Sequence, residues 1–180
     1  ENDSVNEASK NPPGISDEEF FNNLCPPLPY NHNPQENEPE IIKKGLLNDR
    51  KFKLYARLKW GEKEWRRHRW AYARLTEQVD KQIGKVLDAL FEAKLENNTI
   101  IIFTSDHGDN DSAHKLEHKE IPYEETIRIP FIIADPDCKN KSYVNTENIV
   151  CNGLDLVPTI CDYVGIIPPP DLKGKSLRQI

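Results

Sequence analysis

The chain has 180 residues, of which 30% are charged and 37% hydrophobic, and its net charge is −6. At roughly 150 residues per domain, this length allows one domain, or one domain with an extension. No apolar run approaches the roughly 20 residues of a membrane-spanning helix, and the acidic balance argues against a dedicated nucleic-acid binder. We therefore expect neither a membrane nor a nucleic acid as a partner. The chain contains no Met and begins at Glu1, so we expect it to be a piece of a longer protein.

Residues 1–50 form a segment that is rich in proline and acid. Seven of the 14 prolines and nine acidic residues fall within the first 40 residues, where Lys10 is the only basic one. The segment has no sustained period of two or 3.6 residues, which predicts an irregular arm. One short helix is expected over Ser16–Asn22, because Ser followed three residues later by Glu is a capping pattern. We therefore divide the chain into this arm and a folded part at 51–180.

The start of the folded part reverses the charge. Residues 51–74 contain nine basic residues, two acidic residues, and Trp60, Trp65 and Trp70. Aromatic rings among arginines occur in sites for single-stranded nucleic acid. However, a step of five residues turns about 140° around a helix, so the three rings do not share one face. We therefore favour a helix packed by its Trp side chains, with arginines solvated or paired to acids, and keep a non-catalytic binding module as an alternative.

The rest of the chain alternates between predicted helices and strands. Apolar residues recur at three- and four-residue steps over Tyr72–Leu90, which predicts an amphipathic helix. Runs of β-branched residues at Thr99–Thr104 and Ile129–Ala134 predict strands, the first buried on both faces as in a parallel sheet. A second amphipathic helix is expected over Leu154–Val164, with Gly165 at its end. This order predicts an α/β fold, with a mixed, mostly parallel sheet flanked by helices.

The polar segment between the two predicted strands holds the candidate chemistry. The sequence Ser-Asp-His-Gly-Asp directly follows the first strand, and ligands of open α/β sheets bind beyond the carboxyl ends of strands. Asp106 offers a carboxylate and His107 an imidazole, which suit a divalent cation although two ligands do not complete a site. His114, His118 and Lys119 follow and could bind an anion or transfer protons. A solvated polar loop is the alternative for each of these three.

Several motifs, taken in their order, resemble the sulfatase family, the formylglycine-dependent enzymes of the alkaline phosphatase superfamily. They are Phe103–Asp109, His118–Lys119, Tyr123–Glu125 and Arg128–Pro130, with the flanking segments Tyr72–Gly84, Asp155–Gly165 and Leu172–Leu177. The resemblance covers approximately residues 65–180. It implies that 51–180 is the C-terminal part of a catalytic domain with an alkaline phosphatase-like fold.

The resemblance also implies roles for single residues. Asp106 matches the calcium-binding carboxylate of the family and His107 the adjacent ligand position, so one Ca²⁺ per intact site is expected. Lys119 matches the lysine that contacts the sulfate ester, where its charge stabilises the transition state. His114 and His118 fall where related enzymes line the substrate pocket, and we carry them over as catalytic candidates. From the family we also expect an extracytoplasmic protein, either periplasmic or secreted.

The nucleophile of the family is not found in this sequence. That nucleophile is a formylglycine made from the first residue of a Cys/Ser-x-Pro-x-Arg motif. Cys25 begins Cys-Pro-Pro-Leu-Pro, which has Pro29 where Arg is required, and it lies too close to the helix at Tyr72. We therefore reject Cys25 as the nucleophile and interpret the chain as a sulfatase fragment. A missing N-terminal half, or self-association, is expected to cover its open sheet edges and apolar faces.

The predicted function of the parent protein is calcium-assisted hydrolysis of a sulfate ester, either on a sulfated glycan or on a small molecule. A phosphoester or phosphonate hydrolase of the same superfamily is an alternative, because the nucleophile that distinguishes the two is not in the chain. The binding module remains the more distant alternative, and retention on heparin that weakens with salt would favour it.

We predict that residues 1–180 alone do not hydrolyse an aryl sulfate, because the chain lacks the nucleophile and part of the metal site. Release of the phenol from a nitrophenyl sulfate measures this directly. Turnover that is abolished by blocking the Cys25 thiol would contradict both this prediction and the rejection of Cys25.

Overall fold

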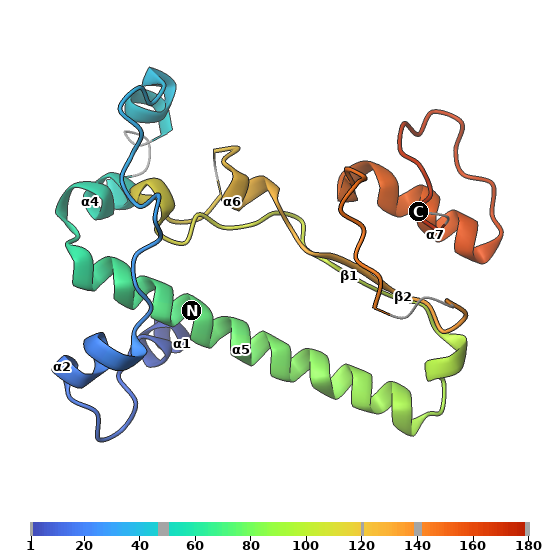
Figure 1. The fold of residues 1–180 in the computed structure, drawn as a ribbon, viewed down its shortest axis with the longest axis horizontal. Coiled ribbons are helices and arrows are strands. Elements are labelled where there is room, and N and C mark those ends of the chain that lie inside the picture. The colour runs from blue at the N-terminus through green and yellow to red at the C-terminus, as the bar shows by residue number, and fades with distance from the viewer. Residues whose placement is uncertain (1, 47–50, 120, 139–141, 179–180) are drawn as a thin grey trace. The chain divides into compact units, whose positions relative to one another are not determined.

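The structure, a computed structural model, describes residues 2–46, 51–119, 121–138 and 142–178. The chain divides into two compact units (Figure 1). Unit 1 comprises Glu1–Glu92 and His107–Arg128, and unit 2 comprises Ala93–Asp106 and Ile129–Ile180. The boundary predicted after residue 50 adjoins residues 47–50, which lie outside the described residues. No helix in the described ranges is both long and apolar enough to cross a membrane.

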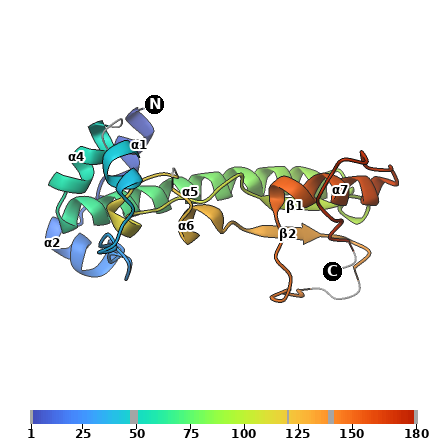
Figure 2. The same cartoon turned by 90° about the horizontal axis from the view of Figure 1, so that it is seen from above.

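Unit 1 is built on two helices that follow each other closely. Helix α4 (Lys51–Lys59) and the long helix α5 (Glu62–Glu92) are separated by a break at Trp60 and Gly61. Glu64 accepts a hydrogen bond from the backbone N–H of Gly61 at 2.9 Å, which closes the first turn of α5. Beyond this turn α5 runs as one continuous helix in both views (Figures 1 and 2). The basic Trp segment is therefore helical as predicted, but it is divided between two helices.

The N-terminal segment is more ordered than predicted. It contains α1 (Asn2–Ala8), α2 (Asp17–Glu19) and two π-helical turns, η1 (Phe20–Leu24) and η2 (Ile42–Leu46). Ser16 accepts from the backbone N–H of Glu19, which confirms the predicted cap. This segment differs from the predicted irregular arm, because Phe20 and Phe21 are buried. The Phe20 ring packs edge-on against the Trp70 ring, with the ring centroids 5.1 Å apart. Single turns of this kind are ordered by contacts and show no sequence period.

Arginine side chains of α5 hold this N-terminal segment by its backbone. Arg66 donates hydrogen bonds to three carbonyl oxygens, those of Phe21, Cys25 and Pro26. Arg67 donates to the Ser9 carbonyl at 2.8 Å, and Arg69 donates to the carbonyl of Pro27. The prediction of solvated or acid-paired arginines was therefore incomplete, because these three also bind main-chain oxygens.

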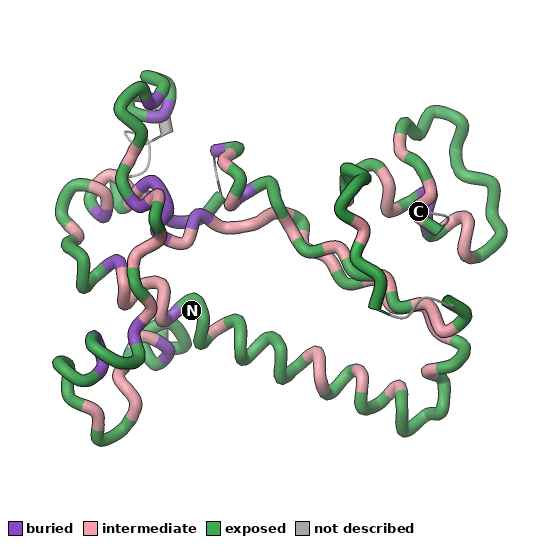
Figure 3. Tube along the Cα trace, viewed as in Figure 1, coloured by how far each residue is buried: buried purple, intermediate pink, exposed green. Residues whose placement is uncertain are grey.

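The two halves of α5 differ in burial. Trp65 and Ala71 are its buried residues, and both lie in the N-terminal third of the helix (Figure 3). Farther along, Val79 and Val86 are 58% and 70% exposed. The apolar stripe that predicted this helix is thus half-buried or exposed, and none of its residues is buried within the described part of the chain.

Unit 2 contains a two-stranded sheet. Strand β1 (Ile101–Thr104) pairs antiparallel with β2 (Phe131–Ala134), with Ile101 opposite Ala134 and Thr104 opposite Phe131. Both strands were predicted, but the expectation that the first is buried on both faces, as in a parallel sheet, is wrong for these residues. Their side chains are half-buried or exposed. A β-branched run fits any pleated surface, so it predicts a strand without fixing the direction of its neighbour.

Helix α7 (Asn152–Val164) confirms the second predicted helix. Gly165 adopts the left-handed conformation, with φ of 71°, where an L side chain would be strained. The N–H groups of Gly165 and Ile166 bond to the carbonyls of Asp162 and Cys161, which satisfies the last turn of the helix. Other short helices of the described residues are η3 (Glu96–Asn98), η4 (Ala113–Lys115) and α6 (Glu124–Ile127).

Candidate functional site

The polar segment begins directly after β1, as predicted. Thr104 Oγ1 donates to the carbonyl of Pro130 at 2.9 Å, and Asn152 Nδ2 donates to the carbonyl of Ser105 at 2.6 Å. Within unit 2, these contacts fix the backbone that leads to Asp106. Asp106 is the last residue of its stretch in unit 2, and the chain continues in unit 1. The metal-binding role of Asp106 stays a prediction.

Gly108 lets two backbone segments of unit 1 approach each other closely. Its N–H donates to the carbonyl of Thr126 at 2.8 Å. A Cβ atom at this position would lie 2.0 Å from the backbone oxygen of Glu125, which is far inside van der Waals contact. Only glycine permits this approach. The contact therefore closes the polar loop by joining its start to α6.

His107 and Lys119 lie against each other in this loop. His107 Nδ1 is 2.7 Å from the carbonyl oxygen of Gly108. Because a carbonyl only accepts, the neutral ring must carry its proton on Nδ1, which leaves a lone pair on Nε2. That atom is in contact with Lys119 Nζ, so the ammonium donates to it. The structure thus places an imidazole lone pair and an ammonium side by side, at two positions singled out from the sequence.

His114 lies inside the loop rather than on its surface. The residue is 5% exposed, and its backbone N–H donates to the carbonyl of Asn31 at 2.9 Å. Its ring stacks on Tyr123 with centroids 3.8 Å apart, and Nε2 is 3.7 Å from a Glu125 oxygen. These contacts give His114 a packing role, and its catalytic role stays a prediction.

His118 has a different environment. Its side chain is 63% exposed and lies between two carboxylates, with Nε2 3.2 Å from Glu117 and Nδ1 3.7 Å from Asp109. Its carbonyl accepts hydrogen bonds from both the backbone and the side-chain amide of the buried Asn110. The backbone of His118 therefore anchors the loop while the imidazole stays open to solvent.

The residues that hold this loop to α5 were not predicted from the sequence. Arg69 Nε donates to Asp111 at 3.0 Å, and Ser112 Oγ donates to the carbonyl of Trp65 at 3.2 Å. Burial raises the pKa of Asp111, while Arg69 opposes the shift. The sequence does indicate that residues 65 and 69 act together, because they are four apart and therefore lie on the same face of the predicted helix. The partners on the loop carry no comparable signal.

The same face of α5 carries a half-buried histidine. The His68 ring lies beside the rings of Trp60 and Trp65, with centroids 5.9 and 6.2 Å away. Burial lowers the pKa of His68, while the nearby Asp111 and Asp109 act in the opposite direction. On this face, α5 presents the Arg69 guanidinium as the charged group that binds the loop.

The described residues do not by themselves make a complete metal site. They contain no group of three His, Cys, Asp or Glu side chains that could hold a metal ion. The chemistry of the donors still fits a metal, because Nε2 of His107 has a lone pair and its Nδ1–H is fixed by a backbone carbonyl. Ligating histidines are commonly oriented in this way. Further ligands would have to come from residues outside those described.

Replacing Gly108 by Ala in the full-length protein should lower stability by about 1–3 kcal/mol, the usual cost of overpacking. The added methyl group must push residues 125–126 away and open the loop. Gly84→Ala is the matched control, because nothing lies within 4 Å of a Cβ atom built there on α5. Urea unfolding compares the two variants. Equal stability of Gly108→Ala and the parent protein would show that the close approach is not a constraint.

Comparisons with known proteins agree on one family. The family model described as "Sulfatase" matches residues 7–166. A Delta 4,5-hexuronate-2-O-sulfatase of Bacteroides thetaiotaomicron is 31% identical over 91% of this chain and 34% of its own length. The solved structure of a 2-O GAG sulfatase has a TM-score of 0.79 at 30% identity, covering 96% of this chain and 37% of its own. A phosphonate monoester hydrolase from Silicibacter pomeroyi has a TM-score of 0.62 at 31% identity, over 69% of this chain and 24% of its own.

Proposed function

The chain belongs to the sulfatase family, and on this basis we propose that the whole protein is a sulfuric ester hydrolase that cleaves a sulfate ester. The chain spans about a third of the length of the curated relative described above, 34%, so the activity belongs to the longer protein. One observation carries the proposal for this chain. Lys119, the residue matched to the sulfate-contacting lysine, lies against His107 in the segment matched to the metal ligands.

Membership in this family implies a metal cofactor, and we propose that it is Ca²⁺. Asp106 would supply a carboxylate oxygen, and His107 would supply its Nε2 lone pair. When bound, a divalent cation polarises the ester oxygens and offsets the negative charge that develops on them. The bond from His107 Nδ1 to the Gly108 carbonyl keeps the ring in the tautomer that can ligate.

Lys119 is the residue of this chain that we propose to contact the sulfate. Its ammonium has three donors, and in the structure it contacts the lone pair of His107 Nε2. One lone pair cannot serve a cation and an ammonium together. In the loaded enzyme the ammonium therefore needs another acceptor, and a sulfate oxygen provides one. A donor held in this way stabilises charge on the transferring group.

The two histidines of the loop receive different roles in this proposal. His118 is the candidate proton donor, because its ring is exposed and flanked by the carboxylates of Glu117 and Asp109. His114 is proposed to support the loop by stacking on Tyr123. The formylglycine nucleophile is proposed to lie elsewhere in the whole protein.

A sulfated glycan is the substrate that we favour over a small sulfate ester. The similar hexuronate-2-O-sulfatase and the similar 2-O GAG sulfatase are both named for sulfated sugars. We also propose an extracytoplasmic location, which rests on the family resemblance alone.

We propose that the remaining part of the protein covers the exposed apolar faces. Val79 and Val86 on α5, and Leu154 and Val164 on α7, are each at least 49% exposed. Large uncovered apolar faces of this kind usually mark an interface. In the isolated chain, self-association would take the place of the missing part.

A phosphonate hydrolase is the second candidate function. The similarity to the phosphonate monoester hydrolase supports it, with 31% identity over 69% of this chain. One assay on the full-length protein distinguishes the two functions. A nitrophenyl sulfate and a nitrophenyl phosphonate monoester are compared by kcat/KM, and preference for the phosphonate would overturn the sulfatase proposal.

In the full-length enzyme, Lys119→Ala should lower kcat/KM for an aryl sulfate by about 10²–10³-fold, the scale of one preorganised donor. Asp106→Ala should abolish turnover and also reduce the metal content of the purified protein. Lys115→Ala removes an equivalent charge from the same loop and serves as the control, with activity near that of the parent. Full activity of Lys119→Ala would exclude it from the site, and unchanged metal content in Asp106→Ala would exclude the carboxylate as a ligand.

A further inference from the structure

Within unit 1, Asn31 joins the N-terminal segment to two parts of the polar loop. Its carbonyl accepts from the backbone N–H of His114 at 2.9 Å, and its side-chain Nδ2 donates to Glu125 Oε1. Because a carboxylate only accepts, the amide nitrogen and not the amide oxygen must face Glu125. A carboxylate acceptor makes such a bond stronger than one between neutral groups. Asn31 therefore holds both η4 and α6 of the loop.

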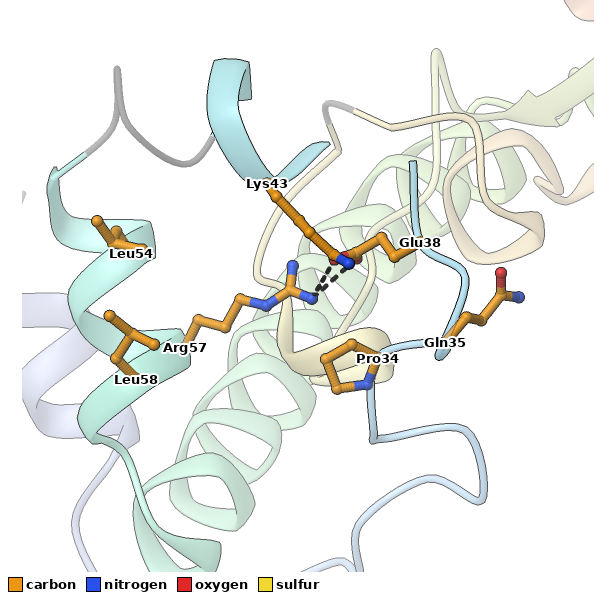
Figure 4. Close-up of a pocket in the computed structure, with 7 residues that line it drawn as sticks. All are labelled: Pro34, Gln35, Glu38, Lys43, Leu54, Arg57 and Leu58. Carbon is orange, nitrogen blue, oxygen red and sulfur yellow. Dashed lines mark hydrogen bonds and ion pairs between the residues drawn. The ribbon is translucent and has the colours of Figure 1, made fainter. Parts of the chain in front are cut away.

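Other contacts hold the segment that carries Asn31. The next residue, the buried His32, donates from Nδ1 to the carbonyl of Ser112 at 2.7 Å. Farther along the segment, Glu38 accepts two hydrogen bonds from Arg57 Nη2 of α4, at 2.8 and 2.7 Å, in the wall of the pocket drawn in Figure 4. The Arg57 and Glu38 side chains are only 9% and 0% exposed. A change confined to the Asn31 side chain should therefore leave this segment in place.

Glu125 contacts Asn31 with its side chain and Gly108 with its backbone. The Glu125 carbonyl oxygen lies so close to Gly108 that a Cβ atom there would be 2.0 Å from it. The next carbonyl, that of Thr126, accepts from the Gly108 N–H at 2.8 Å. The position of Glu125 therefore determines the position of the Gly108 backbone.

The Gly108 backbone in turn orients the His107 imidazole. The Gly108 carbonyl accepts from His107 Nδ1 at 2.7 Å, which leaves the Nε2 lone pair for a ligand. Partners of this kind orient ligating histidines, and their loss weakens metal binding. A displacement of α6 would therefore change the direction of the lone pair that is proposed to bind the metal.

We propose that Asn31 is a positioning residue of the metal site. Its amide holds Glu125 in place, so that the backbone of Gly108 keeps the His107 ring in the orientation that binds the cation. The inference rests on the proposed function, because it requires the metal-binding role of His107. It assigns a part in the site to a residue of the N-terminal segment, outside the motifs that identified His107.

Calorimetric titration of the metal-free full-length protein with Ca²⁺ tests the proposal. In Asn31→Asp the side chain keeps its size but places a carboxylate against that of Glu125, and the two repel each other. We expect this variant to bind Ca²⁺ about tenfold more weakly than the parent, the lower end of the usual effect of losing an outer-shell partner. Asn33→Asp, on an exposed side chain of the same segment, is the matched control and should bind Ca²⁺ as the parent does. An added negative charge by itself favours Ca²⁺, so weaker binding is opposite in sign to a general charge effect.

A double variant separates positioning from a general loss of structure. Asn31→Asp combined with Glu125→Gln exchanges donor and acceptor, so the bond can form again with the same total charge. We expect the double variant to recover the Ca²⁺ affinity of the parent. Parent affinity in Asn31→Asp, or no recovery in the double variant, would overturn this inference alone. A parent protein that binds no Ca²⁺ would instead overturn the proposed metal site, and this inference with it.

Discussion

The arrangement of unit 1 depends on the side chain of Arg69. From α5, this arginine donates to the carbonyl of Pro27 in the N-terminal segment and to the carboxylate of Asp111 in the polar loop. Its side chain and that of Asp111 are 23% and 25% exposed, so the pair is partly shielded from water. A charge-assisted bond in such a place is stronger than one on the surface. One guanidinium thus ties together the helix, the N-terminal segment and the loop that carries Lys119.

The loop needs this support because its backbone is strained. Non-glycine residues with positive φ, between 42° and 76°, recur along it at Asp111, Ser112, His114, Lys115 and His118. Such conformations persist only where surrounding contacts hold them, at a cost on the order of 1 kcal/mol or more each. Anchors come from the carbonyls of Trp65 and Asn31 and from Arg69. The N-terminal segment is therefore part of the framework of the site, although the motifs that predict function lie far from it in sequence.

The sequence predicted the elements that depend on local chemistry. Helix α7 with its Gly165 stop and both strands follow from periodicity and turn residues, and the α/β fold of the alkaline phosphatase type is confirmed by solved sulfatase structures. The direction of the strand pair and the order of the N-terminal segment were not predictable, because both are fixed by contacts between distant residues. In the site, the sulfatase-like motif identified His107 and Lys119 from the sequence. Arg69 could not be identified in this way, because its role is to bind Asp111 in a loop more than 40 residues later in the chain.

Amide hydrogen exchange on the full-length protein tests the central claim, that Arg69 holds the loop of Lys119. Arg69→Met is compared with Arg74→Met, which removes an arginine that contacts Glu77 and the ring of Trp70, both within α5. The amides of 112 and 116 are hydrogen-bonded within the loop, and the amide of 114 is bonded to the carbonyl of Asn31. We predict that these three amides exchange at least tenfold faster in Arg69→Met and at the parent rate in Arg74→Met. Unchanged protection of these amides in Arg69→Met would contradict the account.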